Sequence, residues 1–269
     1  MFALFLVNVV IPLVAGVVYF LMALEIKRVS RVRKLIFGEI GYRRAFIGFL
    51  LLGIYLITRP FQNILGPHPY PMVVNCIRQF FLMAIIAPSI LVGIFHWAAV
   101  KWKVPKAAEV SSYVIGFLMA LIFILINIVA IDGSKIIVQW NGFKLYDATW
   151  FSDGNQRIEL ILIHLIVQGI SPVGFFLLAS GYVRHRRHNY PPDSVYNLMP
   201  LKWKYLETGL IIFALSFIFA GCAAFFGHYY TYLWVIYYTG AIVAGVIELK
   251  GIKIPPREEP DDLKGISNA

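Results

Sequence analysis

Seven stretches of the chain are each long and apolar enough to cross a lipid bilayer. A helix needs roughly 20 mostly apolar residues to span a hydrocarbon core about 30 Å thick. The stretches that meet this requirement are Phe2–Glu25, Ala45–Leu65, Met72–Ala99, Val110–Ile131, Ile158–Val183, Tyr205–Phe226 and Tyr230–Leu249. They take up most of the 269 residues, so the sequence predicts one all-α seven-helix transmembrane domain over residues 1–250. We expect the polar, proline-containing tail at 251–269 to be disordered.

Positive charges fall in alternate gaps between these stretches. Of the 24 Lys and Arg residues, 19 lie after the first, third and fifth stretches or in the tail. Cytoplasmic loops of membrane proteins are enriched in Lys and Arg. We therefore expect the N-terminus outside and the C-terminus in the cytoplasm, with the cell inner (plasma) membrane as the location. The net charge of +10 is then explained by contact with anionic membrane lipids, and it requires no nucleic acid as a partner.

The gap between the fourth and fifth stretches carries a turn signal. Residues 136–140 and 143–146 are two β-prone runs separated by Asn141-Gly142. Asn-Gly favours a type I′ turn, in which both central residues have positive φ. The sequence predicts a β-hairpin at Gln139–Tyr146, forming a small extracytoplasmic flap over the outer mouth of the bundle. A flap that is only a lid and a flap that takes part in binding both remain open.

Polar residues at membrane depth are the main clue to function, because ionisable groups there are costly and usually face the bundle interior. Placed by topology, most lie in the outer half, including Asp132 at the end of the fourth helix. The candidate ligand-binding residues are Arg78, Asn75, Arg59, Asp132, Glu159, His164 and Gln168. We interpret them as lining an outward-facing polar pocket centred on Arg78. Alternatively, these groups bond to one another as interhelical contacts, or some reach the headgroup zone.

Several chemistries lack the residues that they need. No His or Cys cluster has metal or haem spacing, and no common catalytic motif is present, so we expect no metal, no cofactor and no enzymatic activity. The two cysteines, Cys76 and Cys222, are interpreted as free thiols. Microbial rhodopsins share this length and topology, but they attach retinal to a lysine in the middle of the seventh helix. Residues 234–248 contain no lysine, so a covalent retinal is not expected.

Seven helices with an outer N-terminus, a polar outer half and an inner C-terminus resemble the seven-helix membrane sensor modules of bacterial histidine kinases. The resemblance implies a receptor that binds a small or lipidic ligand from outside. We expect no kinase domain, because only about 20 residues follow Leu249. Such a receptor would signal through a separate protein partner or a homo-oligomer, by way of its membrane helices or of the loops at 27–44 and 184–204.

Two alternatives belong to other classes of protein. One is a structural or assembly subunit of a larger membrane complex, in which the polar helix faces pair with other chains. The other is a transporter, which would need a polar path through the inner halves of the helices. The sequence offers Glu25 and Glu248 there, and we expect both at the level of the headgroups.

Overall fold

The computed structural model describes residues 2–33, 39–98, 104–150, 158–188, 199–223 and 230–253. They contain seven helices that are long and apolar enough to span a membrane, which confirms the predicted number of spans. In chain order the spans are α1 (Phe2–Phe5) with η1 (Leu6–Val10) and α2 (Ile11–Arg33), α3 (Glu39–Ile57) with α4 (Arg59–Ile64), α5 (Tyr70–Phe81) with η2 (Leu82–Ile86) and α6 (Ala87–Ala98), α7 (Lys106–Ala130), α8 (Ile158–His164) with η3 (Leu165–Ile170) and α9 (Ser171–His188), α10 (Met199–Ala223), and α11 (Tyr230–Lys253). The predicted tail begins inside α11, and its residues from 254 onward lie outside the described part of the chain.

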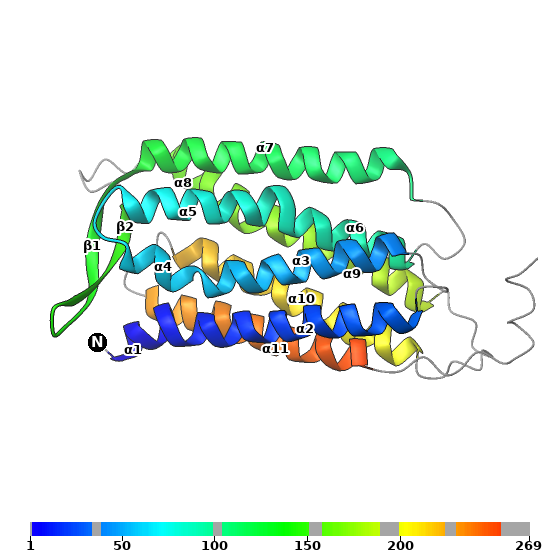
Figure 1. Cartoon of the computed structure of the whole chain (residues 1–269). Coiled ribbons are helices and arrows are strands. Elements are labelled where there is room, and N and C mark those ends of the chain that lie inside the picture. Colours follow the sequence, from blue (N-terminus) through cyan, green and yellow to red (C-terminus); the bar gives the residue numbers. More distant parts are fainter. Residues whose placement is uncertain are drawn as a thin grey trace, which may run out of the picture.

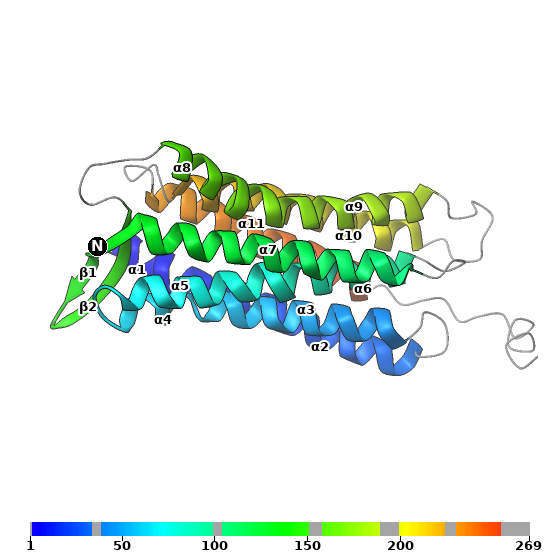
Figure 2. The same ribbon diagram turned by 90° about the horizontal axis from the view of Figure 1, so that it is seen from above.

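Six of the seven spans close into a ring. Helix α2 packs on α3, α3 on α6, α6 on α9, α9 on α10, α10 on α11, and α11 returns to α2 (Figures 1 and 2). Helix α7 lies outside this ring, against the third and fifth spans. Aromatic side chains such as Tyr19, Phe213 and Phe217 fill the ring interior, where each is at most 2% exposed. Any buried polar group therefore has to be accommodated among tightly packed rings.

Three spans contain a π-helical segment directly before a proline. The segments η1, η2 and η3 each end two residues before Pro12, Pro88 and Pro172, respectively. Proline has no backbone N–H, and its ring collides with the carbonyl four residues earlier in an α-helix. A wider turn relieves that collision. The three prolines therefore coincide with local changes of helix type.

The hairpin is the only pair of strands in the described chain. Strand β1 (Ile131–Trp140) pairs antiparallel with β2 (Phe143–Trp150). Asn141 and Gly142 have φ of 44° and 82°, as the predicted turn requires. The Asn-Gly turn is therefore confirmed. The hairpin lies across one end of the bundle, called the hairpin end below, and its strand β2 contacts α4 and α5 (Figure 1).

One sequence-based expectation about this end was wrong. Asp132 does not finish the fourth helix: α7 ends at Ala130, and Asp132 is an exposed residue of β1. The second span, predicted to end at Leu65, ends with the short helix α4. Pro60 lies in the first turn of α4, where the missing N–H would have had no helical partner in any case.

Candidate functional site

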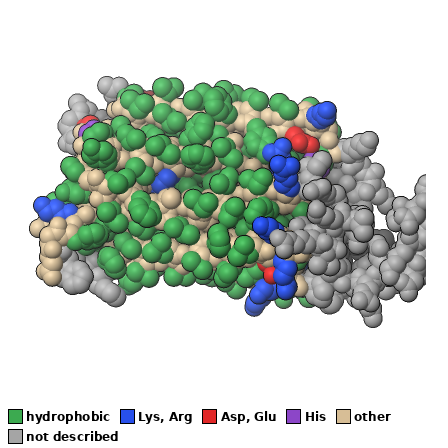
Figure 3. Space-filling model, viewed as in Figure 1, with side chains coloured by type: hydrophobic (Ala, Val, Ile, Leu, Met, Phe, Trp, Pro, Cys, Tyr) green, Lys and Arg blue, Asp and Glu red, His purple; other side chains and the backbone are tan. Residues whose placement is uncertain are grey.

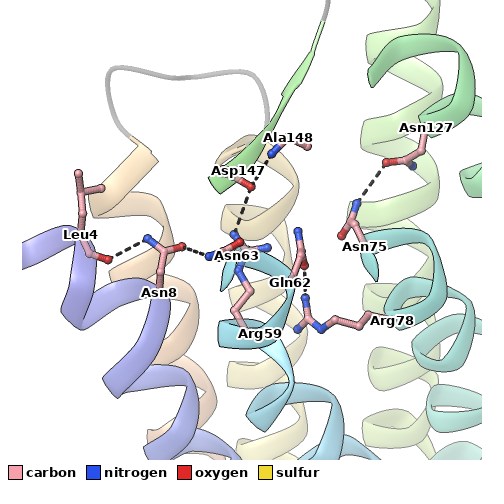
Figure 4. A network of polar contacts seen from close by, with 10 residues as sticks. All are labelled: Leu4, Asn8, Arg59, Gln62, Asn63, Asn75, Arg78, Asn127, Asp147 and Ala148. Carbon is pink, nitrogen blue, oxygen red and sulfur yellow. Dashed lines mark hydrogen bonds and ion pairs between the residues drawn. The ribbon is translucent and has the colours of Figure 1, made fainter. Parts of the chain in front are cut away.

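Two arginines are buried at the hairpin end of the bundle. Arg59 begins α4 and is 4% exposed, while Arg78 lies in the last turn of α5 and is 6% exposed. Both lie within helices of the predicted spans. Because an ionised side chain at membrane depth is costly, its partners decide whether it is a structural or a functional group. We call Arg59, Arg78 and the residues that contact them the arginine cluster (Figure 4).

All described partners of Arg78 are neutral. Its Nε donates to Thr58 Oγ1 at 3.2 Å, one terminal nitrogen donates to Gln62 Oε1 at 2.5 Å, and the other donates to the Tyr55 carbonyl at 2.9 Å. The guanidinium also lies 4.5 Å from the centroid of the Tyr55 ring. Among the ion pairs of the described residues, none includes Arg78. No acidic partner of Arg78 is therefore found in the described part of the chain.

Arg59 contacts the hairpin. Its guanidinium lies over the Trp234 ring of α11, 4.6 Å from the centroid, and 3.9 Å from Asp147 Oδ1 of β2. Asp147 is 7% exposed, and the same oxygen accepts from the backbone N–H of Ala148 at 3.0 Å. The flap thus supplies a buried carboxylate to the cluster. With two guanidinium groups and one such carboxylate, the described part of the cluster has an excess of positive charge.

Amide side chains connect the cluster to the first span. Asn63 Nδ2 donates to Asn8 Oδ1 at 3.1 Å, and Asn8 Nδ2 donates to the Leu4 carbonyl at 2.9 Å. On the other side, Gln79 Nε2 donates to the Tyr55 hydroxyl at 3.1 Å. Asn8 lies in the π-helical segment η1, whose irregular geometry leaves backbone groups to be satisfied by side chains.

The sequence did not place Gln62, Asn63 and Asp147 at the site. Arg59, Gln62 and Asn63 are spaced i, i+3, i+4, which puts them on one face of a helix. That signal was present in the sequence but was not used. Asp147 follows the predicted hairpin by one residue, and nothing in the local sequence indicates that its side chain meets Arg59.

The remaining candidate residues lie elsewhere. Asn75 faces α7, where its Nδ2 donates to Asn127 Oδ1 at 3.2 Å. His164 is fully buried on the Phe123 ring, with centroids 5.3 Å apart. Asp132 and Glu159 are exposed, and the side chain of Gln168 lies outside the described part. The structure therefore brings Arg59 and Arg78 together, and it places Asn75 and His164 in a second region beside α7.

Within the described residues, no group of three or more His, Cys, Asp or Glu side chains has a geometry that could hold a metal ion. Cys76 and Cys222 are free thiols. The chain matches no protein-family model, no curated protein and no solved structure. Function therefore has to be argued from the arginine cluster itself.

Proposed function

We propose that this chain is a receptor-like integral membrane protein that binds an anionic ligand at the arginine cluster, from the outer side of the membrane. The observation that carries the proposal is Arg78, a buried guanidinium whose described partners are all neutral, beside a second buried guanidinium at Arg59. Burying a cation is costly unless an anion compensates it. A ligand carboxylate or phosphate supplies that anion, and the planar guanidinium fork suits either group.

The neutral partners hold Arg78 in position for such a ligand. Thr58, Gln62 and the Tyr55 carbonyl fix the guanidinium from the side of α3 and α4. They are acceptors without a full charge, so an incoming anion would form stronger bonds than any of them. Side chains held by several hydrogen bonds lose little entropy when a ligand arrives, which favours binding.

The surface of the bundle favours a ligand with an apolar part. Exposed apolar side chains cover the face shown in Figure 3, and basic side-chain atoms appear within this face over α4 and α5. A lipidic anion could place its charged head at the arginine cluster and its chain along the apolar face. The ligand class that we propose is therefore an amphiphile with a carboxylate or phosphate head.

The hairpin gives the site a means of reporting occupancy. Asp147 of β2 and Trp234 of α11 both contact Arg59, so an anion that pairs with Arg59 competes with Asp147. Competition for one cation would shift the hairpin and α11 relative to α4. A change of this kind can pass to a separate partner protein.

Ligand-dependent stability tests this proposal against the subunit alternative. The protein is purified in mild detergent, and its melting temperature is measured with decanoate, decyl phosphate, decanol and decyltrimethylammonium. We expect an increase of several degrees with the two anions and none with the alcohol or the cation, because ligands that bind only the folded state stabilise it. Stoichiometric co-purification of other subunits, with no response to anions, would favour the structural-subunit function instead.

Orientation is tested separately. In a chain whose Cys76 and Cys222 are replaced by Ala, single cysteines are introduced at Asn141 in the hairpin turn and at Ser30 near the opposite end. A membrane-impermeant maleimide added to intact cells should label position 141 and not position 30, because the charge distribution predicts an outward-facing hairpin. The reverse pattern would place the arginine cluster on the cytoplasmic side.

A further inference from the structure

Glu248 is buried far from the arginine cluster, toward the other end of the bundle. It lies on α11, five residues before that helix ends, and it is 0% exposed. Among the described residues, no group forms a hydrogen bond with either carboxyl oxygen. Its carboxyl group is therefore enclosed by the bundle.

The helices around Glu248 approach closely enough to leave room only for this side chain. A Cβ at Gly209 of α10 would overlap the Cγ of Glu248 and would lie 3.0 Å from its Cδ. One turn earlier on α11, a Cβ at Gly245 would lie 3.3 Å from the Cζ of Tyr19. Tyr19 of α2 is 0% exposed, and its hydroxyl has no hydrogen-bond partner among the described residues.

Three arginines near this level are paired with other carboxylates. Helix α11 packs against α2, η1 and α10. On α10, Glu207 is paired with Arg184 and Arg187 of α9, each at 2.9 Å. On α2, Glu25 is paired with Arg28 at 2.6 Å. The other titratable or charged residues of these elements near the same end are Lys27, Arg31 and Arg33 on α2, Lys202, Lys204 and Tyr205 on α10, and Lys250 and Lys253 on α11. None of the ion pairs found in the described chain includes Glu248.

We propose that Glu248 is a proton-binding site of the bundle, which holds its proton in this conformation. An ionised carboxylate that is buried without a cation or a donor is costly, whereas the neutral acid is tolerated. The carboxyl O–H bond therefore stays intact while the bundle encloses the side chain.

The site goes beyond the proposed receptor function and does not depend on it. A proton is favoured over a metal cation because too few oxygens are gathered there: the two carboxyl oxygens and the Tyr19 hydroxyl fall short of the six or more oxygen ligands that calcium takes. If proton exchange at Glu248 changes when an anion binds at the arginine cluster, the transporter alternative gains the inner polar group that it needs.

Infrared spectroscopy of the purified chain in detergent tests the proposal. The wild type should show the carbonyl stretch of a protonated carboxylic acid at pH 7, and Glu248→Gln should lose it while keeping the wild-type melting temperature. The control Glu207→Gln, which removes an ion-paired carboxylate, should keep the band.

Two results would overturn the inference. If the wild-type spectrum has no acid band that disappears in Glu248→Gln, the carboxyl group is ionised. If the Glu248→Gln chain does not fold, a neutral group is not tolerated at this position.

Discussion

Arg78→Ala should lower the free energy of unfolding by about 1–3 kcal/mol, because it leaves Gln62 Oε1 buried without its donor. Thr58 Oγ1 also donates to the Tyr55 carbonyl, at 2.8 Å in the wild type. We expect this bond to remain in the variant, so that acceptor stays satisfied. Lys144→Ala in the exposed hairpin is the control and should stay within about 0.5 kcal/mol of the wild type. Unfolding in mixed micelles, followed by circular dichroism, measures both changes.

The double variant Arg78→Met/Gln62→Leu separates structure from function. Replacing both partners of a buried hydrogen bond by apolar groups of similar shape is nearly neutral for stability. It also removes the desolvation cost of the guanidinium. We therefore expect the double variant to be more stable than Arg78→Ala. If the double variant is instead the less stable of the two, Arg78 has a structural role that its described contacts do not explain.

Gly53→Ala should also be strongly destabilising, at about 1–3 kcal/mol, and Gly53→Val should fail to give folded protein. A Cβ at Gly53 of α3 would lie 3.0 Å from both the Gly16 carbonyl oxygen and the Phe20 nitrogen of α2. Both neighbours are backbone atoms, so relief requires the two helices to separate. Small residues allow such close contact between membrane helices.

The matched control for this prediction is Gly181→Ala on α9. A Cβ there meets nothing within 4 Å, so the change should leave stability unchanged or raise it by up to about 1 kcal/mol through helix propensity. Thermal unfolding of the two alanine variants in the same detergent gives the comparison. Equal melting temperatures would show that α2 and α3 are not packed at Gly16 and Gly53 as described.

Apolar length and turn chemistry were sufficient to predict the seven spans and the Asn141-Gly142 turn, because both depend on local sequence. The pairing of polar groups was not predictable in the same way. Asn63 bonds to Asn8 across 55 residues, and that contact depends on how two mostly apolar helices are rotated about their axes. Helices that are apolar on nearly every face carry little periodic information about this rotation.

One misplacement has a physical cause. Asp132 was placed at the end of the fourth helix because the fourth apolar stretch runs to Ile131, whereas α7 ends at Ala130 and β1 begins at the next residue. The burial of the Glu248 carboxyl group was not predicted, because it depends on the space that Gly209 leaves on the neighbouring helix α10.

Binding of decyl phosphate tests the central claim most directly. Equilibrium dialysis of the labelled anion is carried out with the wild type, with Arg78→Met/Gln62→Leu, and with Asn75→Ala, which changes a polar side chain that faces α7 instead of the cluster. We expect one saturable site per chain in the wild type and in Asn75→Ala, and at least a tenfold weaker affinity in the folded double variant. Equal binding by the wild type and the double variant, or no saturable binding by the wild type, would contradict an anion site at Arg78.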